Sequence, residues 1–151
     1  MDVPKMKTAG SFEIITNSSE ETFQAGRNFA KTLSPGNILA FCGDLAAGKT
    51  TFIKGIITAM TTFPVEQINS PTFIYLNLYE SSKTIYHFDL YRLKNSDDFL
   101  DMGFDEYLFS DGICCIEWAE RIQDIIPPHA IVIHMIHLEK NQRQITIQTS
   151  E

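Results

Sequence analysis

The segment Gly43–Thr50 (GDLAAGKT) constrains the fold of this sequence most strongly, because it fits the pattern G-x-x-x-x-G-K-[ST] at every fixed position. It lies between an apolar run, Asn37–Cys42, and a helical stripe of apolar residues over 52–60. A loop of this kind turns successive backbone N–H groups inward and points a helix N-terminus at the same place, which suits a polyphosphate. The motif therefore predicts a nucleotide site in which Lys49 reaches the β- and γ-phosphates and the Thr50 hydroxyl ligates Mg²⁺.

Short apolar runs and helical patterns alternate around this loop, as expected of strands and of the helices that cover them. The predicted strands are 12–16, 37–42, 73–79, 84–90, 112–116, 130–138 and 142–149. The predicted helices run from a Ser-x-x-Glu capping box at 18–21 to Leu33, over 52–60 and over 119–126, with short helical turns in 95–109. Two strand pairs, joined at 80–83 and around 140–141, are predicted hairpins.

These elements predict an α/β fold: a P-loop NTPase-like three-layer sandwich with a mixed sheet and antiparallel hairpin additions. The aromatic residues of 73–79 and 86–91 are expected to pack in its core, because few basic residues interleave them. Residues 1–11 are polar and small, which predicts a flexible N-terminal tail. The length of 151 residues predicts a single domain, over 12–151.

Charge and cysteine usage narrow the class of protein. Acidic residues outnumber basic ones by 19 to 12, and the resulting net charge of −7 disfavours a protein that coats DNA or RNA. Cys42, Cys114 and Cys115 lie in apolar runs without a C-x-x-C motif, which predicts buried free thiols. There is no signal-peptide pattern, and no apolar run approaches the roughly 18 residues of a membrane span. We therefore expect a soluble cytoplasmic protein without membrane contact.

Two predicted strands end in a carboxylate. The run Ile85–Asp89 ends in Asp89, and the run Ile113–Glu117 ends in Glu117. Because ligands of α/β sheets collect at the carboxyl ends of strands, both acids are expected beside the phosphate loop. Either one could hold magnesium, directly or through water, or orient an attacking water.

The segment Asn69–Thr72 (NSPT) precedes the first predicted hairpin strand and allows two interpretations. It is either simple turn chemistry before an edge strand, or a switch in which the hydroxyls of Ser70 and Thr72 sense the γ-phosphate or magnesium.

Five segments, taken in order, are similar to the motifs of one known family. They are GDLAAGKTTF (Gly43–Phe52), SPTF (Ser70–Phe73), YHFDLYRL (Tyr86–Leu93), MGFDEYL (Met102–Leu108) and GICCIEW (Gly112–Trp118). Together they resemble TsaE, formerly YjeE, the bacterial P-loop ATPase family of tRNA threonylcarbamoyladenosine biosynthesis, over about residues 14–126. A phosphate loop alone is shared by many families, whereas this set of motifs at the family spacing is far more specific.

The resemblance implies a protein that binds ATP and Mg²⁺ and hydrolyses ATP weakly by itself and faster with its partners. The implied partners are TsaB and TsaD, which together transfer a threonylcarbamoyl group to adenosine 37 of tRNA. ATP hydrolysis would reset that complex between turnovers, and the protein would meet tRNA only indirectly, through the complex. Two alternatives stay open: a small P-loop kinase acting on a metabolite or nucleoside, and a non-hydrolytic nucleotide-dependent switch.

The resemblance also implies roles for individual residues. Lys49, Asp89 and Glu117 would form the catalytic set, with Thr50 and Glu117 holding magnesium and Asp89 as the Walker-B-like acid. Trp118 would lie next to the nucleotide. The implied nucleotide-binding residues are Gly43, Asp44, Leu45, Ala46, Ala47, Gly48, Lys49, Thr50, Thr51, Ser19 and Arg143.

One residue of the loop departs from the family pattern, which usually has glycine where this chain has Ala46. If that position requires a positive φ, alanine costs about 1 kcal/mol there. The other fixed positions are intact, so we expect nucleotide binding to survive the change.

Six acidic residues fall within 97–111, and no lysine or arginine lies among them. They are Asp97, Asp98, Asp101, Asp105, Glu106 and Asp111. Such a stretch is commonly a solvated face. Our hypothesis is that it meets a basic surface of the partner complex. Charge reversal in this stretch would then weaken assembly of the complex without changing the affinity for ATP.

Overall fold

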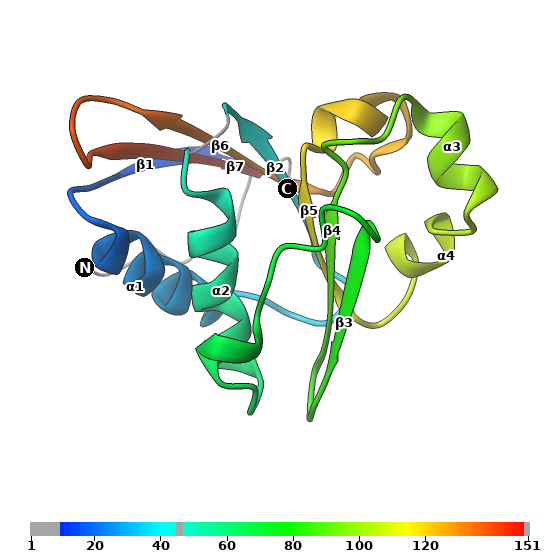
Figure 1. Cartoon of the computed structure of the whole chain (residues 1–151), viewed down its shortest axis with the longest axis horizontal. Helices are drawn as coiled ribbons and strands as arrows, with labels where there is room; N and C mark the ends of the chain where they lie inside the picture. The colour runs from blue at the N-terminus through cyan, green and yellow to red at the C-terminus, as the bar shows by residue number, and fades with distance from the viewer. Residues whose placement is uncertain (1–9, 45–46, 150–151) are drawn as a thin grey trace.

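The computed structural model describes residues 10–44 and 47–149, and within them seven strands form one mixed sheet (Figure 1). The strand order is β1-β7-β6-β2-β5-β4-β3. Four parallel strands make the centre: β2 (Ile38–Gly43), β4 (Thr84–Asp89), β5 (Ile113–Glu117) and β6 (Ile131–His137). Three antiparallel strands complete the edges: β1 (Gly10–Thr16), β3 (Leu76–Glu80) and β7 (Arg143–Thr149). The predicted mixed sheet and both predicted hairpins, β3–β4 and β6–β7, are confirmed.

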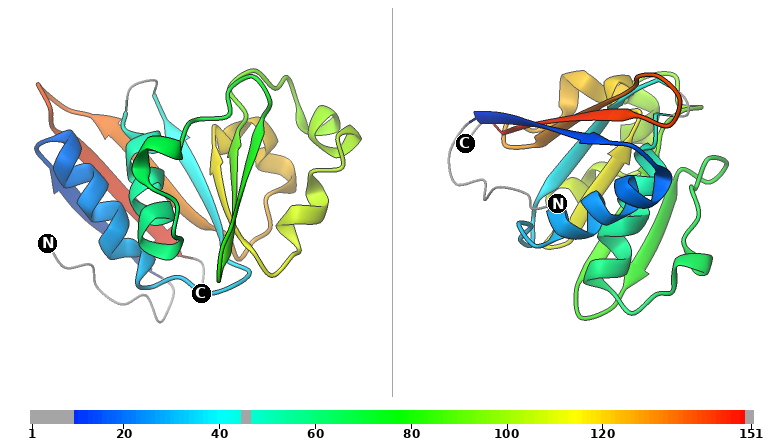
Figure 2. Two further views of the ribbon diagram at one scale, coloured as in Figure 1. Left: turned by 60° about the horizontal axis from the view of Figure 1, so that its bottom comes forward. Right: turned by 90° about the vertical axis from the view of Figure 1, so that its left-hand side faces the viewer.

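Two helices, α1 (Ser19–Ala30) and α2 (Lys49–Met60), lie side by side on one face of the sheet (Figure 2). They pack closely because glycine stands at the contact on both helices. A Cβ on Gly26 would lie 2.1 Å from the carbonyl oxygen of Phe52, and a Cβ on Gly55 would lie 2.1 Å from that of Phe23. This close packing of α1 against α2 therefore fixes the start of α2, where the phosphate loop ends.

The opposite face carries the short helices α3 (Ser96–Asp101) and α4 (Asp105–Leu108) and the 3₁₀ segment η2 (Ala119–Ile125). A cluster of aromatic rings, in which Phe88 and Phe99 are buried and Phe104 is partly buried, joins α3 and α4 to the sheet. Helices on both faces confirm the predicted three-layer sandwich. A further 3₁₀ turn, η1 (Val65–Gln67), follows α2.

Several predicted element bounds need correction. β1 begins at Gly10, so Gly10 and Ser11, expected in the tail, belong to the sheet; residues 1–9 lie outside the described range. α1 ends at Ala30 rather than Leu33, because the N–H groups of the next residues reach back only three positions, as Leu33 does to Ala30. The predicted helix over 119–126 is 3₁₀ and is broken at the buried Ile122, whose φ of −127° is not helical.

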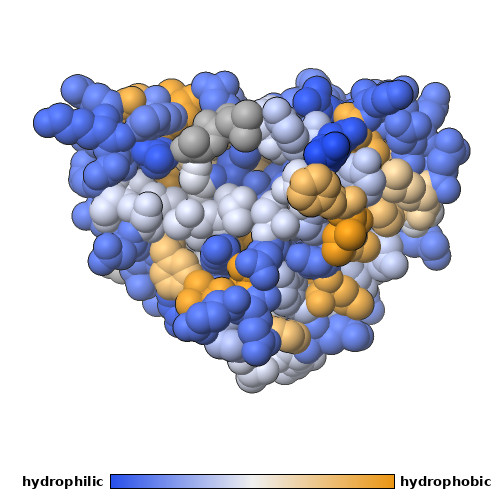
Figure 3. Space-filling model, viewed as in Figure 1, coloured by the Kyte–Doolittle hydropathy of each residue, from blue (hydrophilic) through white to orange (hydrophobic). Residues whose placement is uncertain are grey.

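The segment 73–75 differs most from its prediction as a strand. The N–H of Tyr75 donates to the carbonyl of Pro71 at 2.7 Å, and Tyr75 has a φ of 70°, so a tight turn precedes β3. This turn leaves Phe73 78% exposed and Ile74 64% exposed. The prediction of core packing is therefore wrong for Phe73 and for the exposed Tyr91, and it is confirmed for Tyr79. Figure 3 shows hydrophobic surface gathered over the region of β3 and β4.

The three cysteines are free, as predicted, with Cys114 and Cys115 buried and Cys42 half-buried. Burial raises the pKa of Cys42 to about 11 and that of Cys114 to about 12. These thiols are therefore protonated and weakly nucleophilic at neutral pH. Among the residues described, no helix combines the length and the apolar character that crossing a membrane requires.

Candidate nucleotide-binding site

The phosphate loop connects β2 to α2, and glycine is required at both of its described ends. Gly43 has a φ of 135°, and a Cβ there would lie 2.0 Å from the carbonyl oxygen of Met135 on β6. Gly48 caps α2 with a φ of 93°, in the left-handed region that favours glycine. The strain expected at Ala46 concerns residues 45–46, which lie outside the described range, and Leu45 shares that gap.

Lys49 is the first residue of α2, and it is buried. Its Nζ donates to the carbonyl oxygen of Gly43 at 2.6 Å and lies 3.7 Å from the centroid of the Trp118 ring. Burial lowers the pKa of Lys49, and the nearby carboxylates of Glu120 and Glu117 oppose that effect. The ammonium group is thus buried and held by one carbonyl oxygen and the face of the Trp118 ring.

Glu117, at the carboxyl end of β5, is 3% exposed and accepts hydrogen bonds from two sides. From α2, the Thr50 hydroxyl donates to Oε1 at 2.9 Å and to Oε2 at 3.0 Å. From β4, Nε2 of His87 lies 2.7 Å from Oε2. Glu117 therefore lies beside the end of the phosphate loop, where the sequence predicts it.

Asp89 ends the neighbouring strand β4, directly in register with Glu117. Its Oδ2 accepts from the hydroxyls of Ser70 at 2.5 Å and Thr72 at 2.9 Å, and its Oδ1 accepts from the N–H of Tyr91 at 3.0 Å. The segment before β3 is therefore tied to this acid by two side-chain hydrogen bonds.

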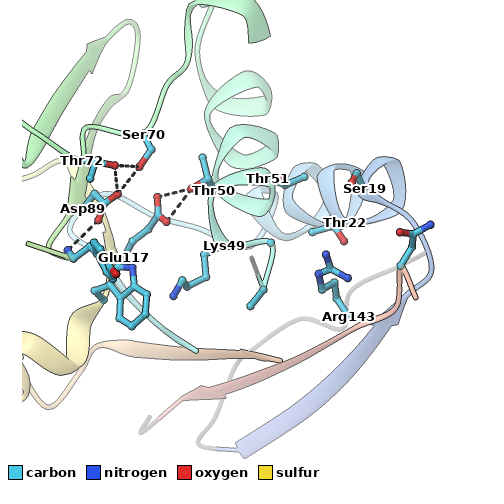
Figure 4. A pocket seen from close by; sticks show the side chains of 15 residues that line it. Ser19, Thr22, Lys49, Thr50, Thr51, Ser70, Thr72, Asp89, Glu117 and Arg143 are labelled. Carbon is cyan, nitrogen blue, oxygen red and sulfur yellow. Dashed lines mark hydrogen bonds between the residues drawn. The ribbon is translucent and has the colours of Figure 1, made fainter. Parts of the chain in front are cut away.

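These residues surround a cavity of about 560 Å³. Figure 4 shows Asp89, Glu117 and Thr50 at one end of it, Arg143 at the other, and Lys49 between them. The predicted site residues that line it are Ser19, Ala47, Gly48, Lys49, Thr50, Thr51, Ser70, Thr72, Asp89, Glu117, Trp118 and Arg143. Gly43 and the exposed Asp44 do not line it.

Sequence reasoning missed Thr22, Tyr91 and Asn141, which also line the cavity, and His87, which contacts Glu117. His87 and Tyr91 stand inside the motif YHFDLYRL, so their spacing of two from Asp89 was an available signal. Thr22 on α1 and Asn141 before β7 carry no local signal, because only the packing of distant elements brings them to the loop.

The donor set suits a hard cation that a nucleotide brings with it. Thr50 and Glu117 present oxygens, which Mg²⁺ prefers. Their atoms Oγ1 and Oε1 are 2.9 Å apart, and two cis ligands of an octahedral ion at about 2.1 Å are about 3.0 Å apart. Over the described part of the chain, no three His, Cys, Asp or Glu side chains cluster as a metal site. Phosphate and water oxygens would therefore have to complete the coordination shell.

The comparison with known proteins agrees with the motifs. A family model described as threonylcarbamoyl adenosine biosynthesis protein TsaE matches residues 16–145. This chain belongs to the TsaE family. The resemblance predicted from the motifs is thereby confirmed.

Similar proteins and a similar structure cover nearly the whole chain. TsaE of Treponema pallidum is 36% identical over 133 residues, which span 88% of this chain and 97% of that protein. TsaE of Rickettsia felis is 39% identical over 140 residues, 91% of this chain and 80% of that protein. The crystal structure of Bacillus subtilis YdiB matches with a TM-score of 0.77 and 28% identity, covering 97% of this chain and 90% of that one. The α/β fold is thus shared with a solved structure.

Proposed function

We propose that this TsaE-family protein binds ATP with Mg²⁺ and serves tRNA threonylcarbamoyladenosine biosynthesis, the process for which its relatives are named. It hydrolyses ATP weakly alone and faster with homologues of TsaB and TsaD, and this hydrolysis resets their complex between turnovers. The observation that carries the proposal is that Lys49, Thr50, Asp89 and Glu117 meet in one cavity beside a phosphate loop.

The loop and the start of α2 supply the anion site. Backbone N–H groups around Gly48 and the N-terminus of a twelve-residue helix favour a polyphosphate. The Lys49 ammonium, which donates to the Gly43 carbonyl, exchanges that contact for a phosphate oxygen. A cavity of about 560 Å³ falls within the roughly 300–1,000 Å³ of small-molecule sites.

The two acids take different parts in this proposal. Thr50 and Glu117 hold the Mg²⁺, which when bound neutralises charge on the β- and γ-phosphates. Asp89 orients the attacking water. Ser70 and Thr72, which donate to Asp89, link that acid to the exposed segment before β3 and so respond to the state of the nucleotide.

A substitution at Lys49 tests the anion site. Lys49→Ala is expected to lower ATP affinity at least about a hundredfold by calorimetry, because it removes the buried ammonium of the loop. Lys54→Ala, on the same helix but outside the cavity, is the matched control and should bind ATP like the wild type. Unchanged affinity in Lys49→Ala would refute the phosphate-loop assignment.

The experiment that decides the function is an assay with purified TsaB and TsaD homologues and substrate tRNA. We expect these partners to raise the ATPase rate, and we expect repeated tRNA modification cycles to require this protein. A lack of stimulation, together with a phosphorylated product from a metabolite and nucleoside panel, would favour the kinase. Repeated modification supported by ATP binding without hydrolysis would favour the non-hydrolytic switch.

A further inference from the structure

His87 is the one residue, over the described ranges 10–44 and 47–149, with a buried side-chain nitrogen or oxygen that lacks a hydrogen-bond partner. The unpartnered atom is Nδ1, and the side chain is fully buried within the sheet. A buried polar atom without a partner is costly. An apolar side chain of similar size would avoid that cost. The reason for a histidine at this position must therefore lie in what its other ring nitrogen contacts.

The other nitrogen, Nε2, contacts the candidate metal ligand. His87 lies in register with Cys115 on β5, and Glu117 is two residues further along that strand on the same face. Nε2 reaches diagonally to Oε2 of Glu117 at 2.7 Å. An ionised carboxylate can only accept hydrogen bonds, so the tautomer that serves Glu117 is the one in which Nε2 carries the proton and donates.

We propose that His87 is a positioning residue for Glu117. By fixing Oε2 it prevents the flexible glutamate from turning away, and it leaves Oε1 2.9 Å from the Thr50 hydroxyl oxygen. That oxygen pair receives the Mg²⁺ of the bound nucleotide, so the inference rests on the proposed function. Hydrogen bonds that orient metal-binding carboxylates are typically worth about 10–100-fold in metal affinity.

Two substitutions that differ by one methylene group test the reach of the donor. In His87→Gln the amide nitrogen can occupy the place of Nε2, whereas in His87→Asn it stops short, near the place of Nδ1. His87→Leu removes the donor and the unpartnered atom together. Ile85→Val lies on the same strand and face but in register with Ile113, further from Glu117 along β5 than Cys115, and it controls for packing.

The readout is binding rather than turnover. Mn²⁺ affinity of the ATP-bound protein is measured by electron paramagnetic resonance, and ATP affinity in EDTA by calorimetry. We expect His87→Asn and His87→Leu to lose about 10–100-fold in Mn²⁺ affinity, His87→Gln to stay within about threefold of the wild type, and ATP affinity in EDTA to be unchanged in all. If His87→Leu does not fold, the Gln and Asn variants alone carry the test.

Three results would overturn the inference: wild-type Mn²⁺ affinity in His87→Asn, an equal loss in His87→Gln and His87→Asn, or a loss of ATP affinity in EDTA that matches the loss for Mn²⁺. A loss in Ile85→Val as large as in His87→Asn would also overturn it, because packing would then explain the effect. If the wild type itself binds no ATP, or binds it without Mn²⁺, the proposed function fails instead, and the two failures are thereby distinguished.

Discussion

Two groups of acidic residues in this protein differ in their burial and in their partners. Asp89 and Glu117 lie at the carboxyl ends of β4 and β5, are 5% and 3% exposed, and each accept hydrogen bonds from hydroxyl groups. Between them in sequence come the six acids of 97–111, carried on α3, α4 and the turn after them. In the part of the chain that the structure describes, the one contact between a basic and an acidic side chain within salt-bridge distance is His87–Glu117, so none of these six acids has a basic partner there.

The difference shows that burial and partners, not residue type, decide what a carboxylate does here. Asp97 and Asp98 begin α3, and Asp105 and Glu106 begin α4, where negative charge stabilises a helix N-terminus. Asp101 ends α3 and Asp111 follows α4, so neither gains from a helix dipole. The net charge of −7 therefore says little about the anion site, which relies on backbone N–H groups and on Lys49.

The largest effect is expected from removing Glu117. Glu117→Ala should retain ATP binding but lose Mg²⁺-dependent turnover at least about a hundredfold, because Thr50 then has no second protein oxygen with which to hold the ion. Steady-state ATPase rates with the partner complex, paired with calorimetry of ATP, measure both quantities. A wild-type rate would remove Glu117 from the mechanism and erase the distinction between the two groups.

Asp89 should matter less and in a different way. Asp89→Asn is expected to lower turnover about 10–100-fold without shifting the Mg²⁺ concentration for half-maximal rate, because Asp89 is proposed to orient water rather than to hold the ion. Glu117→Gln, by contrast, should shift that concentration upward. A shift in Asp89→Asn but not in Glu117→Gln would transfer the metal contact to Asp89.

Removing the hydroxyl groups that donate to Asp89 should have a smaller effect still. Ser70→Ala or Thr72→Ala alone leaves one hydroxyl group that still donates to Oδ2 of Asp89. Each single variant should therefore lower turnover less than about threefold. The double variant should cost about tenfold, with ATP affinity unchanged, and Thr62→Ala, exposed and outside the cavity, serves as control. If the double variant turns over ATP like the wild type, Ser70 and Thr72 form only a turn.

The parts of the site that could be predicted are those that short stretches of sequence specify. The loop, Lys49 and Thr50 form one contiguous motif, and Asp89 and Glu117 end apolar runs, so strand direction places them together. The contact from His87 to Glu117 depends on the register of β4 against β5, which no local pattern encodes. The turn before β3 depends on a positive φ at Tyr75, a conformation that an aromatic side chain does not signal.

The smallest effect on the isolated protein is expected from charge reversal at Asp101 and Asp111, two of the six acids of 97–111. Both side chains are exposed, and lysine at the end of α3 should stabilise that helix slightly, so the double variant changes charge without disturbing the fold. ATP affinity should be unchanged, whereas association with the TsaB–TsaD complex should weaken about tenfold at low salt and less at high salt. Association measured by surface plasmon resonance at two ionic strengths separates these cases. Unchanged association at both ionic strengths would show that 97–111 is only a solvated face. A loss of ATP affinity as large as the loss of association would show that the two groups of acids are not independent.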